Sequence, residues 1–371
     1  MSLTNFAALT DEAKTTWSRD LWKAARNNMF ISRFTGTGQD AMIQRITDLT
    51  KSEKGSRAVI TLVADLEGDG VAGDRQLEGN EESMKAYDQV IQLDQLRHAS
   101  RHEGRMADQT SVVNYRKNAR DVLAYWLADR CDQLSFLTMS GVSYGMTTNG
   151  ILRPANSDLN VLEFASDVTA PSSNRHLRWD STSGGSLKPG ATNSVISADK
   201  PTWNMLIEAK AYMKDNYIRP MRGSAGMEVY NVFMTPQGIA KLKQDPDFIA
   251  AWRNAMPRSG SNPLFKGTEV IYVDGLAIYE YRHVYNTKGA TSGSKWGAGG
   301  DVDGQRVLFC GAQAMGMADI GSPEWIEKGF DYDNQQSISV GKIFGMKKPV
   351  FRSQVTKTDE DFGILCVDTA L

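Results

Sequence analysis

The residues best suited to chemistry are the carboxylates of an acidic, glycine-rich stretch in the first quarter of the chain. A calcium-binding loop begins with the spacing found here at Asp65, Glu67, Asp69 and Gly70. Such a loop needs a bidentate glutamate at its twelfth position, where this chain has Gln76, and a helix in front of it. The stretch is therefore interpreted as a solvated acidic loop, or as one whose carboxylates meet a basic surface on a neighbouring molecule.

Two histidines also have a spacing that metal ligands use. His98 and His102 lie four residues apart beside Glu103, a pattern that could hold a metal on one face of a helix. The segment HASRH does not match HExxH and no third ligand is apparent, so structural or solvent-exposed histidines are expected. The arginines at 97, 101 and 105 could face nucleic acid, but a solvated turn or a pairing with acidic neighbours is preferred.

No motif predicts catalysis or a bound cofactor. The sequence lacks GxSxG, GxxxxGK[ST] and a strand-to-helix GxGxxG. Its 371 residues are 41% hydrophobic and 23% charged, as in ordinary globular proteins, and the net charge of −2 excludes a globally basic surface for nucleic acid. No signal peptide or membrane-spanning run is predicted. Cys131, Cys310 and Cys366 form no CxxC pair, which favours buried free thiols in a reducing compartment.

The acidic stretch lies between two strand-like runs. RAVITLVADL and KAYDQVIQLDQL flank EGDGVAGDRQLEGNEES, and each run would extend about 33 Å as a strand. A two-stranded ribbon of this length has no core of its own, so it is expected to lie on a neighbouring subunit. The carboxylates predicted to make intersubunit contacts there are Glu67, Asp69, Asp74, Glu78, Glu81 and Glu82.

Helical periodicity dominates the segments on either side of the ribbon. Residues 106–140 contain no proline or glycine and carry an apolar stripe that includes Ala119, Val122 and Trp126, so a long rod ending at Gly141 is predicted. Residues 1–34 are predicted to form an arm with one amphipathic helix. Its apolar stripe consists of Trp17, Leu21, Trp22, Ala25 and Met29, at spacings of three and four. Trp17 and Trp22 would contact a partner surface, although the arm could also pack on its own domain.

The second half of the chain reads as a mixed α+β unit. A helix is predicted from Pro201, followed by a buried strand EVYNVFMT, two short helices from Pro236, and a hairpin whose turn is Asp274–Gly275. Residues 141–200 and 286–305 are interpreted as loops or surface excursions, and the apolar runs near the C-terminus as returning strands.

The order of these elements resembles the HK97-like fold of tailed-phage major capsid proteins. The sequence is similar to the major capsid protein family of N4-like podoviruses and related prophages over essentially its whole length. The ribbon segment AVITLVADLEGDGVAGDRQLEGNEE carries the most specific part of the match. FAALTDEAKTTWSRDLW, RNNMFISRF, IQLDQLRHASRHEGRMADQ, VLAYWLADRCDQ and DYDNQQSISVGKIFG carry the rest.

This resemblance implies an α+β, HK97-like capsid fold with named parts. These would be an N-terminal arm at 1–50, an E-loop at 51–100, a P-domain at 101–200 with a spine helix at 106–140 and a loop-rich excursion, an A-domain at 201–325, and returning P-domain strands at 326–371. The implied function is self-assembly, as pentamers and hexamers, into an icosahedral shell that encloses double-stranded DNA. A scaffolding protein, a portal and a decoration protein are the expected partners, in a virion assembled in the host cytoplasm without a membrane.

One family feature is not expected. Some members join an E-loop lysine covalently to an asparagine, but this chain has no lysine between Lys54 and Lys85. We therefore predict a lattice without such crosslinks. A long cleavable scaffolding segment is not expected either, because only about 50 residues precede the ribbon. A separate scaffolding protein is therefore expected.

Two other classes stay open at this stage. One is a soluble enzyme or binding protein with a pocket between the rod helix and the α+β unit. The other is a bacterial nanocompartment shell, which shares the fold and encloses an enzyme.

Overall fold

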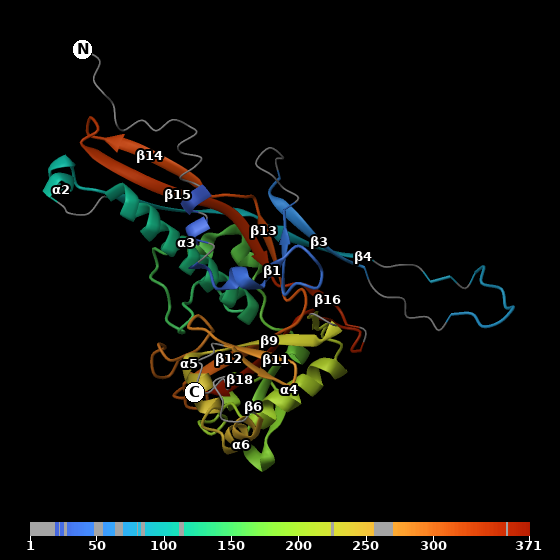
Figure 1. Ribbon diagram of the computed structural model, residues 1–371. Helices are drawn as coiled ribbons and strands as arrows, with labels where there is room; N and C mark the ends of the chain where they lie inside the picture. The colour runs from blue at the N-terminus through green and yellow to red at the C-terminus, as the bar shows by residue number, and fades with distance from the viewer. Residues whose placement is uncertain are drawn as a thin grey trace.

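The computed structural model has two lobes, an upper one built around a long helix and a lower one built around the larger sheet (Figure 1). It describes residues 19–21, 23–25, 28–47, 55–63, 70–79, 81–82, 86–110, 115–223, 226–255, 270–353 and 355–371. Both lobes combine helices with sheets, as the predicted α+β class requires. Within these ranges no helix is long and apolar enough to cross a bilayer.

The upper lobe contains a six-stranded sheet centred on β15 (Gln335–Lys347). Its other strands are β1 (Thr35–Gly36), β2 (Ile43–Ile46), β5 (Asp94–Arg101), β13 (Met315–Asp319) and β14 (Glu324–Phe330), and the separate ribbon consists of β3 (Arg57–Val63) and β4 (Ala86–Gln92). β15 pairs antiparallel with β5, β13 and β14 along different parts of its length. The β14–β15 hairpin and the ribbon extend from opposite ends of this lobe (Figure 1).

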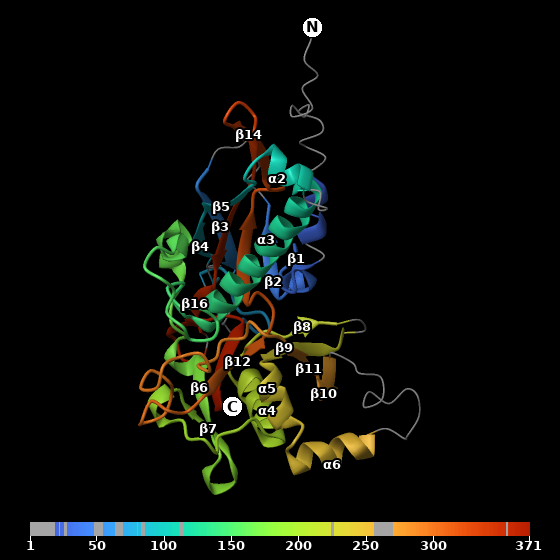
Figure 2. The same ribbon diagram turned by 90° about the vertical axis from the view of Figure 1, so that its left-hand side faces the viewer.

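The predicted rod is present as α3 (Tyr115–Ser140), preceded by α2 (Arg105–Thr110), while residues 111–114 lie outside the described part of the chain. α3 crosses the upper lobe diagonally towards the lower lobe (Figure 2). Gly141 ends it with a φ of +65°, as predicted, and a Cβ there would lie 2.5 Å from the carbonyl oxygen of Thr169. Val122, expected in the apolar stripe, is instead 64% exposed, because the adjacent Leu123 takes the core position.

The lower lobe is built on an eight-stranded sheet with the order β10-β11-β9-β12-β18-β6-β7, in which β8 also pairs with β9. Its strands are β6 (His176–Asp180), β7 (Ser186–Pro189), β8 (Met221–Arg222), β9 (Glu228–Met234), β10 (Val270–Val273), β11 (Leu276–Glu280), β12 (Gly304–Cys310) and β18 (Ile364–Ala370). The helices α4 (Trp203–Asp215), α5 (Pro236–Leu242) and α6 (Pro246–Ala255) lie in the same lobe (Figure 2).

The hairpin of β10 and β11 confirms the predicted turn. Val273 pairs with Leu276 across Asp274 and Gly275, whose φ angles are +47° and +76°. Left-handed backbone at both central residues is the geometry that suits the right-handed twist of the flanking strands. Asp-Gly at this position therefore encodes the hairpin locally.

Three predictions about local structure were wrong. Residues 176–189 are not a surface excursion, because β6 and β7 join the lower sheet and bury Trp179 to 1% exposure. The segment around Arg97 and Arg101 is not a solvated turn, because β5 pairs with β15 over its full length. Pro201 does not lie inside the helix, since α4 begins at Trp203 behind an N-cap at Thr202.

From β12 to β18, the chain passes from the lower lobe to the upper lobe and back again. β12 belongs to the lower sheet and β13, after four intervening residues, to the upper sheet. β18 then returns to the lower sheet, where it pairs antiparallel with β12 and parallel with β6. Residues 176–189 and 364–370, expected in the P-domain, thus share a sheet with strands of the expected A-domain. Residues 315–325, expected in the A-domain, enter the upper sheet.

The three cysteines are buried and form no disulfide, which confirms the prediction of free thiols. Burial raises the pKa of Cys131 and of Cys366 to about 12. At neutral pH both thiols therefore remain protonated and unreactive, and they act as small apolar side chains of the core.

Trp126 gives a test of how the rod packs. Its half-buried ring stacks on His98 with a centroid distance of 4.5 Å. We expect Trp126→Ala to lower the free energy of unfolding by about 2 kcal/mol, less than a fully buried tryptophan would cost. Tyr125→Ala, at a side chain that is 60% exposed, should change it by less than about 0.5 kcal/mol in the same urea titration. Equal effects of the two variants would contradict this packing.

Candidate assembly interface

The root of the ribbon is the part of β3 and β4 around Ile60 and Ile91. It packs on Gly316 and Gly345 of the upper sheet, which we call the glycine seat. Ile60 of β3 and Ile91 of β4 are 2% and 0% exposed. A Cβ on Gly316 of β13 would lie 2.0 Å from Ile60 Cδ1, and a Cβ on Gly345 of β15 would lie 2.1 Å from the carbonyl oxygen of Gln92. Both distances are far below van der Waals contact. Only glycine lets the ribbon approach the sheet this closely.

Polar contacts hold the same root in place. Asp167 accepts hydrogen bonds from the backbone N–H of Gln92 at 3.1 Å and from Lys347 Nζ at 3.1 Å. Lys347 Nζ also donates to the carbonyl oxygen of Val90 at 2.9 Å. The root therefore belongs to its own subunit. This corrects the expectation that the whole ribbon lies on a neighbour, since β3 and β4 share a small core with Phe351 and Ala318 of the upper lobe.

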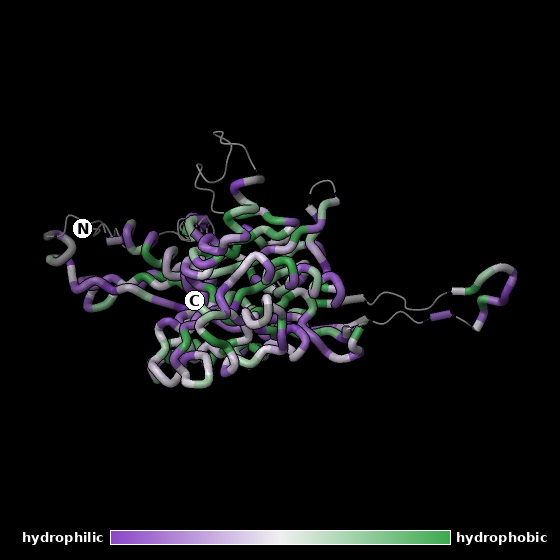
Figure 3. Tube along the Cα trace, turned by 90° about the horizontal axis from the view of Figure 1, so that it is seen from below, coloured by the Kyte–Doolittle hydropathy of each residue, from purple (hydrophilic) through white to green (hydrophobic). Residues whose placement is uncertain are grey.

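The tip of the ribbon differs from its root in exposure and in charge. We define the acidic tip as residues 70–79 and 81–82, the described part of the connection between β3 and β4. Residues 72–79 and 81–82 are all exposed, and the tip lies far from both lobes (Figures 1 and 3). Its predicted contact residues are Asp74, Glu78, Glu81 and Glu82, whereas Glu67 and Asp69 lie outside the described residues.

The backbone of the acidic tip is made of turns. Gly70, Gly73 and Gly79 have φ angles of +75°, +66° and +87°, which only glycine adopts easily. The N–H of Gly79 donates to Glu81 Oε2 at 2.8 Å, so this carboxylate is partly engaged within its own turn. Leu77 is 60% exposed in the middle of the acidic residues. The tip thus offers carboxylates and one large, exposed apolar side chain to another surface.

The N-terminal arm joins the core through its apolar stripe. Leu21, Ala25 and Met29 are 0%, 0% and 3% exposed, which confirms the predicted spacing and shows that this part packs on its own subunit. Asp132 of α3 fixes the end of the arm, because it accepts hydrogen bonds from the backbone N–H groups of Phe30 and Ile31 at 3.0 and 3.1 Å. Burial raises the pKa of Asp132 despite these bonds.

The contacts predicted for Trp17 and Trp22 stay predictions, because both residues lie outside the described part of the chain. The calcium-like positions Asp65, Glu67 and Asp69 lie outside it as well. Among the residues that the structure does describe, no group of His, Cys, Asp and Glu could hold a metal ion.

The two histidines are structural, as expected. They lie on or just after the strand β5 rather than on a helix. His98 stacks on Trp126, and His102 packs edge-on against Tyr115 with a centroid distance of 4.9 Å. His102 Nε2 also accepts a hydrogen bond from the backbone N–H of Gln336 at 3.1 Å. The pair therefore helps to hold β5 and β15 beside α3.

Arg306 links a buried ion pair of the lower sheet to the end of α3 in the upper lobe. Arg306 of β12 donates from Nε to Asp368 Oδ1 at 2.8 Å and from Nη1 to the carbonyl oxygen of Ser140, the last residue of α3, at 2.7 Å. His176 Nε2 lies 2.6 Å from Asp368 Oδ2. Burial raises the pKa of Asp368, but Arg306 and the hydrogen bond with His176 outweigh burial and hold this pKa below its usual value.

Sequence reasoning missed the residues that form the seat. Gly316, Gly345, Asp167 and Lys347 lie far from the ribbon in the sequence, and nothing in their local patterns names the ribbon as their partner. A weak signal was present, because Gly316 in AMGMAD and Gly345 in IFGMK interrupt strand-like runs. A glycine inside a strand often marks the close approach of another backbone.

The geometry defines a class of protein. A long helix on a sheet, a ribbon with an anchored root and an exposed tip, and a second mixed lobe make a shell-forming structural protein with the HK97-like fold. The capsid of Ralstonia phage GP4 matches this fold with a TM-score of 0.74 and 27% identity, over 92% of this chain and 90% of that one. The capsid of cyanophage Pam1 matches it with a TM-score of 0.70 and 18% identity, over 100% of this chain and 96% of that one.

Sequence comparison gives the family. Residues 5–371 match the model of the phage capsid protein family. The chain is 57% identical over 368 residues to the major capsid protein of Pseudomonas phage KPP25, which covers 99% of this chain and 97% of that protein. The chain therefore belongs to the phage capsid protein family. It is a major capsid protein that forms the capsid shell, a structural part of the virion rather than an enzyme.

The glycine seat can be tested by adding one methyl group. Gly316→Ala should lower the free energy of unfolding by about 1–3 kcal/mol, because Ile60 has to move out of its packed position. Amide hydrogen exchange should speed up mainly in β3 and β4. Gly38→Ala, where the nearest atom lies 4.0 Å from the new Cβ, is the matched control and should leave exchange in the ribbon unchanged. Unchanged amide exchange in the ribbon of both variants would contradict the close packing of Ile60 on Gly316.

The buried ion pair of Arg306 and Asp368 should make stability depend on pH. At pH 7, Asp368→Asn should cost about 3–5 kcal/mol of unfolding free energy in the unassembled subunit, because Arg306 is left buried without its counter-ion. The folded pKa of Asp368 is lowered, so its contribution is fully present above the unfolded value near pH 4 and is lost as the pH falls through the folded value. The difference in unfolding free energy between wild type and Asp368→Asn should therefore become smaller below about pH 4.

The exposed Asp359→Asn is the control and should change unfolding by less than about 0.5 kcal/mol at any pH. Urea titrations from pH 7 to pH 2 measure both variants. A difference for Asp368→Asn that stayed constant over this range would contradict the assigned ion pair.

Proposed function

We propose that the chain builds its shell by laying the acidic tip of each ribbon on an adjacent subunit, in pentamers and hexamers. The contrast within the ribbon is the observation that supports this. Its root is buried on its own upper lobe, while the described tip is exposed and lies away from both lobes (Figure 3). A segment held rigidly at one end and presented to solvent at the other is suited to binding a second molecule.

The proposal extends to the parts of the shell. The ribbon would be the E-loop, α3 the spine helix of the P-domain, and the lower lobe the body of the A-domain. The shell would enclose double-stranded DNA without reading its sequence. This fits the net charge of −2, which offers no overall basic surface. A scaffolding protein, a portal and a decoration protein would be its partners during assembly in the host cytoplasm. The placement among N4-like podoviruses rests on the segments quoted above.

Deleting the tip separates folding from assembly. Replacement of residues 67–83 by a short Gly-Ser linker should change the unfolding free energy of the unassembled subunit by less than about 1 kcal/mol, because the seat is kept. Shell yield, measured by sedimentation and negative-stain microscopy with the proteins that wild type needs for assembly, should fall at least about tenfold. A full-length tip in which Asp74, Glu78, Glu81 and Glu82 become glutamine tests charge separately from length. Normal shells from the deletion variant would refute the proposed role.

A further inference from the structure

A polar cleft lies where the two lobes meet beside the root of the ribbon. It has a volume of about 640 Å³. Its walls are formed by Tyr87 of the ribbon, by the hairpin of β16 (Val350–Arg352) and β17 (Asp359–Asp361), and by residues 214, 216–220, 222, 228 and 230 of the lower lobe. This volume is large enough for several amino-acid side chains, and nothing in the family role described above uses it.

The acidic groups in the cleft wall are already neutralised. Asp361 Oδ2 accepts from Lys348 Nζ at 2.8 Å, and Glu228 Oε2 accepts from Lys214 Nζ at 2.7 Å. Glu360 Oε2 lies 3.0 Å from Arg175 Nη2, and the other oxygen of this carboxylate, Oε1, accepts hydrogen bonds from Asn174 and Thr356. These carboxylates therefore do not repel an incoming anion as free charges would.

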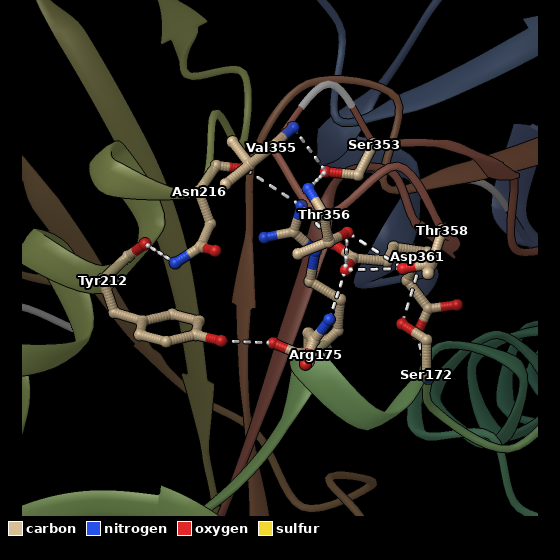
Figure 4. A network of polar contacts seen from close by, with 11 residues as sticks. Ser172, Arg175, Tyr212, Asn216, Ser353, Val355, Thr356, Thr358 and Asp361 are labelled. Carbon is tan, nitrogen blue, oxygen red and sulfur yellow. Dashed lines mark hydrogen bonds and ion pairs between the residues drawn. The ribbon is translucent and has the colours of Figure 1, made fainter.

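The basic groups are not all neutralised. Arg222 and Arg352 line the cleft and are exposed, and neither makes a hydrogen bond or ion pair with the residues that the structure describes. Arg222 stands opposite Glu228 in the β8–β9 pair and helps Lys214 to lower the pKa of that carboxyl. Arg175, whose side chain is 4% exposed, donates from Nη2 to the carbonyl oxygen of Asn216 at 3.0 Å (Figure 4). Its Nε and Nη1 are buried with no hydrogen-bond partner among the described residues. Buried donors without acceptors are costly, so they point to an acceptor that is supplied by another molecule.

The rim of the cleft also offers an aromatic ring. Tyr217 is 71% exposed and its backbone has a φ of +54°, a conformation that is strained for a tyrosine. The cleft thus presents arginine donors next to an exposed apolar surface. The acidic tip presents the complement, with four carboxylates, the single cation Arg75, and the exposed Leu77.

We propose that this cleft is the receiving site for the acidic tip of a second copy of the chain, with tip carboxylates bound by Arg222 and Arg352 and Leu77 packed against Tyr217. This inference rests on the proposed function and adds the surface that the tip contacts. A guanidinium group binds a carboxylate with two parallel hydrogen bonds, which gives a defined register as well as attraction. The tip of the same copy is not the occupant, because it lies far from both lobes (Figure 1).

A charge swap tests the pairing. Arg222→Glu with Arg352→Glu should reduce shell yield at least about tenfold, and so should Asp74→Arg with Glu78→Arg. All four substitutions in one chain should restore the yield to within about threefold of wild type, since the swapped charges again attract. Lys200→Glu with Lys243→Glu changes the charge by the same amount at exposed sites outside the cleft, and should assemble normally. Thermal unfolding of each unassembled subunit checks that it is folded.

The outcomes separate this inference from the proposed function. If the tip variants fail and the cleft variants assemble normally, the tip still contacts a neighbour but the cleft is not its site. If both pairs fail and the fourfold variant is not rescued, the pairing is wrong. If the tip variants themselves assemble normally, both the proposed pairing and the proposed function are wrong.

A binding measurement identifies the ligand chemistry. A synthetic peptide of residues 70–82 should bind the unassembled wild-type subunit, and its affinity should fall at least about tenfold for Arg222→Glu with Arg352→Glu. A scrambled peptide of the same composition should bind less tightly. Equal binding of the scrambled peptide, or its complete displacement by inorganic phosphate at equal concentration, would mean a general anion site and would overturn the assignment.

Discussion

A two-stranded ribbon cannot supply its own core, and much of the upper lobe is arranged around that constraint. Ile60 and Ile91 face the sheet and are buried, whereas Val59 and Val90 on the other face are 46% and 39% exposed. The seat exists only where β13 and β15 pair, because its two glycines come one from each strand. The ribbon root therefore becomes stable only after a contact between residues about 250 positions apart in the sequence has formed.

The connection between the lobes also depends on contacts between residues that are distant in the sequence. β12 and β13 carry the chain from one sheet to the other through a short buried segment, and β18 returns to the lower sheet beside β12. Arg306 reinforces this passage, since one guanidinium group contacts a carboxylate of the lower sheet and the end of α3 in the upper lobe. A buried pair of this kind fixes geometry more surely than it adds stability, because desolvation offsets much of the attraction.

The sequence predicted elements whose signals are local and failed where the partner is distant. The Asp274–Gly275 hairpin, the end of α3 at Gly141 and the buried stripe at Leu21 and Ala25 follow from backbone preference or helical spacing. β5 was missed because RHASRHEGR alternates poorly and becomes a strand through its pairing with β15. β6 and β7 were missed for the same reason, since Trp179 is buried by strands far along the chain.

Some charged groups at the cleft are paired within the subunit, and others are left to pair with a neighbouring subunit. Its carboxylates at the cleft are paired internally, while donors of Arg175 and the side chains of Arg222 and Arg352 are not paired within the described chain. An exposed ion pair contributes little, but an arginine–carboxylate pair enclosed in a cleft gains from the lower dielectric and from two hydrogen bonds. We predict a lattice without lysine crosslinks in the ribbon, because residues 55–84 contain no lysine, and such a lattice would draw its cohesion from non-covalent terms of this kind. Such a lattice would be more sensitive to ionic strength than one that is covalently linked, since salt screens charge but leaves a covalent bond intact.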